Sequence, residues 1–142
     1  MQRGHSHFLG EILVAMITEY FEVGDNKWGV LLCYGYGRRD LRDMWAIMRS
    51  FGISDDDAER SLDILSHLDT GMTISNDDIR MSVIFISDAS SEVEWWNTLA
   101  HELYHVNNAI IDYYGEAWDG EPPAYLQGYL FRKIMDRIGV CE

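Results

Sequence analysis

The chain has 142 residues, 47% of them hydrophobic, and a formal net charge of −13 at pH 7. This length and apolar content exclude a disordered chain and predict a single domain over residues 1–142. The charge disfavours phosphate-backbone partners, so we expect no nucleic-acid binding, and the lack of an uninterrupted apolar stretch of about 18 residues predicts no membrane span.

The first predicted element is a β-hairpin. Residues 12–23 and 28–36 are apolar runs rich in β-branched and aromatic side chains, and the turn-forming residues 24–27 separate them. A helix is the alternative for the first run, because four of its neighbouring apolar residues also have helical spacing: Leu9, Leu13, Met16 and Tyr20. We favour two strands.

Two helices are predicted next. Residues 40–51 carry apolar side chains at helical spacing, and Gly52 can end that helix. The second helix begins near Ser54, which is followed by three aspartates that suit a helix N-terminus. Its apolar face consists of Ala58, Leu62, Leu65 and Leu68. We expect both helices to cover one side of a sheet.

A second pair of strands is predicted in the middle of the chain. Residues 79–86 show a period-two pattern between turn-forming residues. Residues 71–75 precede the turn 76–78 and can pair with this strand as a hairpin. Two antiparallel strands are therefore expected immediately before the next helix.

A long amphipathic helix is predicted over residues 92–114. Ser91 followed by Glu94 is a capping-box pattern, and Gly115 is a suitable C-terminal stop. The stripe that faces the core is formed by Leu99, Leu103, Val106 and Ile110.

This helix carries an HExxH motif at residues 101–105 (HELYH). Two imidazoles four residues apart project from one helix face, so His101 and His105 can share one zinc ion. Glu102 beside the first histidine can then act as the general base on water. The alternative is a helix whose two histidines only satisfy local hydrogen bonds.

A catalytic zinc site usually takes a third protein ligand. The metzincin continuation is excluded, because Asn108 and Ile111 stand where that class requires Gly and His. Downstream acidic candidates are Asp112, Glu116, Asp119 and Glu121. We favour Glu121, because residues 120–126 look like the opening of another helix, with prolines tolerated in its first turn.

That second helix continues an apolar stripe formed by Tyr125, Leu126, Tyr129, Leu130, Ile134 and Ile138. The segment 115–120 is long enough to let the chain double back toward the first helix. Glu116 and Asp119 are kept as reserve ligands, and Glu121 has an alternative role as an acidic group at a helix N-terminus.

The HExxH motif and the later Glu-Pro-Pro-Ala segment at residues 121–124 resemble the zincin metallopeptidases, and among them the gluzincin pattern. The resemblance covers about residues 79–131 and extends to short zincin-like proteins of phages and mobile elements and to peptidases that cleave phage-type repressors. It implies Zn²⁺ ligands at His101, His105 and Glu121, with Glu102 as catalytic base. Nothing corresponds to the large second lobe of thermolysin-like enzymes.

The resemblance implies an α+β fold of minimal zincin type. A small antiparallel sheet would pack on the HExxH helix, a second helix would bring a ligand, and one edge strand would align an extended peptide. We therefore predict a zinc metallopeptidase that acts on a peptide or protein. The alternatives are a zinc-stabilised protein-interaction module without turnover and a zincin scaffold that has lost its metal.

Other residues carry weaker predictions. Tyr104, Tyr113, Tyr114 and Tyr125 flank the motif, and a tyrosine hydroxyl can stabilise an oxyanion, although packing is the alternative for each. His5 and His7 are expected to be solvated, and His67 to complement the dipole at a helix C-terminus or to pack. Trp95 and Trp96 are expected to lie in the core.

The two cysteines, Cys33 and Cys141, suggest neither a disulfide framework nor a cysteine zinc site. The first residues lack a signal-type apolar core, so we expect a cytoplasmic protein.

Overall fold

The computed structural model describes residues 15–25, 27–118 and 123–139. Along the chain, the elements are β1 (Ile17–Val23), β2 (Trp28–Tyr34), the 3₁₀ turn η1 (Arg38–Asp40), α2 (Leu41–Ser50), α3 (Asp55–Leu65), β3 (Gly71–Asn76), β4 (Met81–Ile86), α4 (Glu92–Tyr114), the 3₁₀ turn η2 (Gly115–Ala117) and α5 (Pro123–Ile138). The expected α+β class is confirmed.

The four strands of the described residues form one sheet in the order β1-β2-β4-β3. The hairpins β1–β2 and β3–β4 are antiparallel, as predicted. The two central strands, β2 and β4, are parallel, so the expectation of an antiparallel sheet is wrong at its centre. Parallel neighbours need a long crossover, and the chain between β2 and β4 supplies one through α2, α3 and β3.

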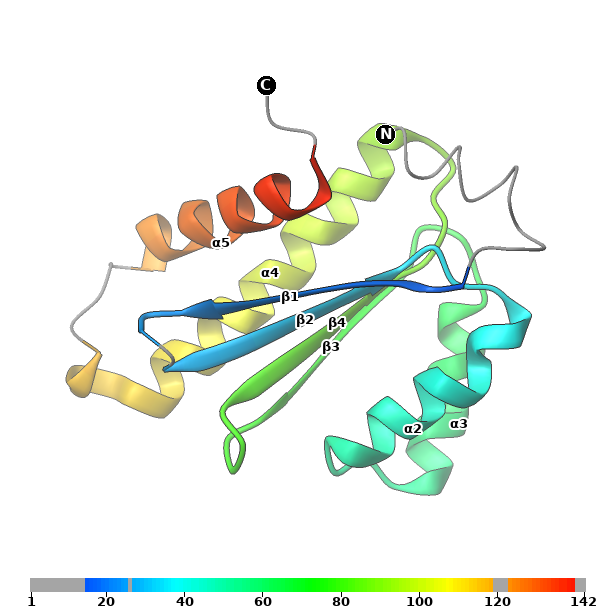
Figure 1. Cartoon of the computed structure of the whole chain (residues 1–142), viewed down its shortest axis with the longest axis horizontal. Helices are drawn as coiled ribbons and strands as arrows, with labels where there is room; N and C mark the ends of the chain where they lie inside the picture. The colour runs from blue at the N-terminus through cyan, green and yellow to red at the C-terminus, as the bar shows by residue number, and fades with distance from the viewer. Residues whose placement is uncertain (1–14, 26, 119–122, 140–142) are drawn as a thin grey trace.

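Helices cover both faces of the sheet (Figure 1). On one face α4 and α5 pack on side chains such as Val30, Leu32 and Ile84. On the other face α2 and α3 pack on Cys33, Val83 and other side chains of the central strands, which confirms that these two helices share one side. Strand β4 is buried along most of its length because it lies between two strands and two helical layers.

The long helix has the predicted ends. The Ser91 hydroxyl accepts a hydrogen bond from the Glu94 backbone N–H at 3.1 Å, and Gly115 follows the last residue with a positive φ of 54°. A left-handed φ of this kind favours glycine, so Gly115 ends α4 without strain. Likewise, Ser54 caps α3 by accepting from the Asp57 N–H.

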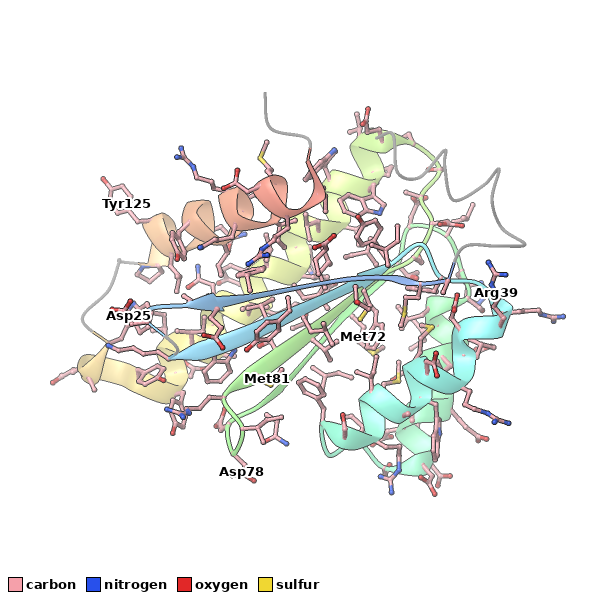
Figure 2. All side chains as sticks on the ribbon, in the orientation of Figure 1. Asp25, Arg39, Met72, Asp78, Met81 and Tyr125 are labelled. Atoms are coloured by element: carbon pink, nitrogen blue, oxygen red, sulfur yellow. The ribbon has the colours of Figure 1, made fainter. Side chains whose placement is uncertain are left out.

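Two boundaries and one buried stripe differ from the predictions. α3 ends at Leu65, and Leu68, expected on its apolar face, is 60% exposed. β4 begins at Met81, so residues 79 and 80 belong to the turn. On α5 the predicted stripe is buried at its leucines and isoleucines, whereas Tyr125 and Tyr129 are exposed. Figure 2 shows Tyr125 projecting away from α5.

A buried polar chain crosses the sheet on the α4 side. The Trp28 indole N–H donates to the Ser82 hydroxyl at 2.9 Å, and this hydroxyl lies 2.7 Å from the Ser75 hydroxyl. The contact joins β2, β4 and β3, and it satisfies polar atoms that would otherwise be costly to bury. No helix among the described residues meets the length and hydrophobicity needed to cross a membrane.

Candidate functional site

The HExxH residues lie in the middle of α4. Successive residues of a helix are about 100° apart around its axis, so His101 and His105 share a face while Glu102 points to the side. Both histidines are exposed, whereas Glu102 is only 6% exposed. The motif therefore presents its imidazoles to solvent and its carboxylate toward the sheet.

The two imidazoles converge. Their Nε2 atoms are 3.3 Å apart, and this contact can serve as a hydrogen bond whose donor depends on the tautomers. Two nitrogens bound to one tetrahedral zinc at the usual Zn–N distance lie about 3.3–3.4 Å apart. The histidine pair thus fits two ligands of one zinc ion.

Glu102 is held by the edge strand β3. The Thr73 hydroxyl lies 2.7 Å from Oε1 of Glu102 and 3.1 Å from the Glu102 carbonyl oxygen. A hydroxyl has one hydrogen to donate, and the shorter contact goes to the carboxylate. Because Thr73 is β-branched, its own side chain has few rotamers, so its hydroxyl is well placed to keep this hydrogen bond.

Gly71 makes the approach of β3 to α4 possible. A Cβ at this position would lie 2.9 Å from Cγ and 3.2 Å from Oε2 of Glu102, and 2.7 Å from Cγ2 of Thr98. Any larger residue would press on the Glu102 side chain. Gly71 and Thr73 both face α4, because alternate residues of a strand point to the same side.

A groove of about 560 Å³ runs between β3 and α4. Its described lining from the strand is Gly71, Met72, Thr73 and Ser75, and its lining from the helix is His101, Glu102, His105, Asn108, Ala109 and Asp112. Met72, labelled in Figure 2, points to the opposite side of the sheet from Gly71 and Thr73. Residues from both faces of β3 therefore line the groove. The imidazole pair, the carboxylate and the edge strand therefore meet in one open groove.

The described residues do not bring a third ligand to the histidine pair. Among residues 15–25, 27–118 and 123–139, no group of three or more His, Cys, Asp or Glu side chains could hold a metal. Asp112 lines the same groove, but it lies seven residues after His105, about 10 Å along the helix. Glu116 is exposed in η2, whereas Asp119 and Glu121 lie outside the described residues.

The start of α5 is tied to α4 close to the motif. The Asn107 side-chain amide donates to the Pro123 carbonyl at 2.7 Å, and the Gln127 amide donates to the Ala100 carbonyl at 3.1 Å. Asn107 is 2% exposed and is two residues after His105. Pro123 and the first turn of α5 are thereby fixed beside α4.

The flanking aromatic residues separate into different roles. The Tyr114 hydroxyl donates to the Lys27 carbonyl, and the Tyr113 ring packs 5.7 Å from the Trp28 ring. Tyr104 and Tyr125 are exposed, and the groove lining among the described residues includes none of the four tyrosines.

The remaining sequence predictions have mixed outcomes. Trp95 lies in the core, as predicted, with Trp96 packed against it. His67 is exposed beyond the end of α3, so it does not have the packing role that was one of its two expected roles, while His5, His7 and Cys141 lie outside the described residues.

The sequence did not reveal three residues that shape this site. Thr73 and Gly71 lie at alternate positions of a strand that was predicted, but their contact with Glu102 depends on how the strand crosses α4. Asn107 was expected only as part of the helix. The one feature that could have singled it out is that Asn107 is polar and yet lies among the buried residues of α4, next to Val106.

Comparison of the chain with family models, curated proteins and solved structures gave no match. The resemblance to zincins therefore depends on the motif residues themselves.

Proposed function

We propose that this chain is a zinc-dependent peptidase. The observation that carries the proposal is the 3.3 Å separation of the His101 and His105 Nε2 atoms beside a carboxylate that Thr73 holds in the same groove. The zincin resemblance of the motif agrees with this geometry. We further propose that the enzyme acts in the cytoplasm.

His101 and His105 supply two zinc ligands, and Glu121 is the proposed third. Pro123, two residues after Glu121, is bound to Asn107 on α4, and two residues span at most about 7 Å. The choice of Glu121 over Glu116 rests on the Glu-Pro-Pro-Ala segment at residues 121–124, which resembles the zincin pattern. Bound there, Zn²⁺ would act as a Lewis acid toward a carbonyl and would acidify water.

Glu102 serves as general base and then as general acid. Its carboxylate accepts a proton from water as the water oxygen bonds to the carbonyl carbon, and returns the proton to the amide nitrogen as the carbon–nitrogen bond breaks. Thr73 occupies Oε1. Oε2, close to Gly71 in the groove, is the oxygen available to water.

The proposed substrate is an extended peptide. β3 has β4 on one side and no strand on its other side among the described residues. An open strand edge offers backbone N–H and C=O groups to a peptide, and main-chain pairing gives affinity without strict side-chain selection.

The test combines metal analysis with a cleavage assay. Purified protein is loaded with zinc, its zinc content is measured by elemental analysis, and cleavage of a peptide library is followed by mass spectrometry. We expect one zinc per chain and turnover. Glu102→Gln should keep the zinc and lower kcat/KM by about 10²–10⁴-fold, because only proton transfer is lost.

Metal-ligand variants provide the comparison. His105→Ala should lose both zinc and activity, and Glu116→Gln, a charge change on the exposed η2 turn, should keep both. Zinc binding without cleavage of any peptide would favour the zinc-stabilised interaction module instead. Unchanged zinc content in His105→Ala would contradict the ligand set.

A further inference from the structure

The Glu102 carboxylate has an unusual environment for a buried acid. The helix places it against the sheet, and 6% of the residue is exposed. Burying a charged group is costly unless hydrogen bonds or opposite charges compensate for it. Among the described residues, its side-chain hydrogen bond is the one from Thr73, and no ion pair to Glu102 is present.

This hydrogen bond links two elements that both take part in the proposed reaction. Thr73 belongs to β3, the edge strand, and its neighbours Gly71, Met72 and Ser75 line the groove. Glu102 belongs to α4 and lies beside the histidine pair. A peptide that pairs with β3 would therefore bind to the same strand that orients the base.

The hydrogen bond from Thr73 limits the rotational freedom of the Glu102 side chain. A glutamate side chain has several rotatable bonds, and fixing them costs conformational entropy. Strand geometry and β-branching fix the hydroxyl of Thr73, while Gly71 leaves room for the carboxylate on its other side. The two strand residues thus define where the Glu102 carboxylate lies.

We infer that Thr73 is a positioning residue, which holds Glu102 in its reactive orientation and couples the edge strand to the base. The inference rests on the proposed function. Because Thr73 touches Glu102 and not the reacting atoms, its loss should affect the chemical step and leave substrate affinity and zinc binding intact.

The experiment compares Thr73→Val with Thr73→Ser in the zinc-loaded protein. Valine keeps the shape and removes the hydroxyl, whereas serine keeps the hydroxyl. We expect kcat of Thr73→Val to fall about 10-fold or more, as for loss of a hydrogen bond to a charged group, with KM within about twofold of the parent. Thr73→Ser should recover most of the lost kcat.

A matched control is Thr18→Val. Thr18 is an exposed threonine on β1, at the opposite edge of the sheet and outside the groove, so the same chemical change there should leave kcat unchanged. Full turnover in Thr73→Val, equal impairment in Thr73→Ser and Thr73→Val, or loss of zinc together with kcat would each overturn the inference.

A second readout separates this inference from the proposed function. Crystal structures of metal-free parent and Thr73→Val protein should show the Glu102 carboxylate displaced or spread over several rotamers in the variant alone. A parent protein that cleaves no peptide would refute the peptidase proposal. A Glu102 carboxylate that stays in place without the Thr73 hydroxyl would refute the positioning role, whether or not the protein is an enzyme.

Discussion

Gly71 lies where β3 passes close to α4, and its lack of a side chain is a steric requirement. An added Cβ would lie 2.7 Å from Thr98 Cγ2 and 2.9 Å from Glu102 Cγ, which is closer than non-bonded carbons approach. We expect Gly71→Ala to lower the free energy of unfolding by about 1–3 kcal/mol, the usual cost of overpacking. Urea denaturation followed by circular dichroism measures this loss.

Gly37→Ala is the control for the glycine substitution. A Cβ on Gly37 would meet no atom within 4 Å, and its φ of −134° suits alanine. Its free energy of unfolding should stay within about 0.5 kcal/mol of the parent. Equal unfolding free energies of Gly71→Ala and Gly37→Ala would contradict the close approach of β3 to α4 at Gly71.

The residues of the HExxH motif could be predicted from the sequence, but the side chains that contact them could not. His101 and His105 meet because of helix geometry alone, so a spacing of four in the sequence predicts their convergence. The contact of Thr73 with Glu102 depends on which strand forms the sheet edge and at what height it crosses α4. Neither quantity is contained in the local pattern of residues 71–75.

One buried amide, that of Asn107, contributes to the attachment of α5 to α4. Asn107 donates to the Pro123 carbonyl, and its Nδ2 also lies 3.4 Å from the Gln127 side-chain oxygen. We expect Asn107→Ala to lower the free energy of unfolding by about 1 kcal/mol, the typical net value of a hydrogen bond. The first turn of α5 should also exchange its amide hydrogens faster, which hydrogen-exchange mass spectrometry detects.

Asn108→Ala is the matched control for the helix attachment. Asn108 is the next residue on the same helix and is exposed, so its truncation should alter neither the unfolding free energy beyond about 0.5 kcal/mol nor exchange in α5. Equal effects of the two variants would show that Asn107 does not secure α5.

Among the elements, periodicity predicted the helices and strands better than their arrangement. The capping residues Ser54 and Ser91 mark the starts of α3 and α4 correctly. The parallel pairing of β2 with β4 was missed, because alternation describes the faces of a strand and not its neighbours. One usable signal was the sequence of β4, which is apolar at all but one position and is buried on both faces, as in central strands.

Two groups with raised pKa values, the Cys33 thiol and the Tyr36 hydroxyl, make the stability of the whole molecule depend on alkaline pH. Burial raises the pKa of the Cys33 thiol to about 12 from its ordinary 9.0. Burial, followed by the negative charge of Asp88 and by Cys33, raises the pKa of the Tyr36 hydroxyl above its ordinary 10.0. The folded protein therefore keeps protons at alkaline pH that the unfolded chain releases.

The sign of the pH dependence follows from this difference. Above pH 9 the unfolded chain binds fewer protons, so the unfolding free energy, constant with respect to Cys33 below that pH, should fall between pH 9 and about 12. Cys33→Ala should make the decline shallower by about 1.4 kcal/mol per pH unit, the value for one proton. Chemical denaturation across this range measures the slope.

Tyr36→Phe provides an independent comparison, because it removes the second raised group and should flatten only the part of the decline above pH 10. Parallel curves for the parent and Cys33→Ala would show that the thiol does not titrate differently in the folded state.

The sheet order has a further consequence for biosynthesis. β2 is buried along nearly all its length, yet its partner β4 follows much later, since Trp28 and Ser82 are 54 residues apart. At translation rates of about 5–20 residues per second, one edge of the apolar strand β2 stays unpaired in the nascent chain for about 3–10 s, until β4 is synthesised. Open strands of this kind aggregate. We therefore expect fragments that stop before residue 81 to precipitate and to need a chaperone, as light scattering would record.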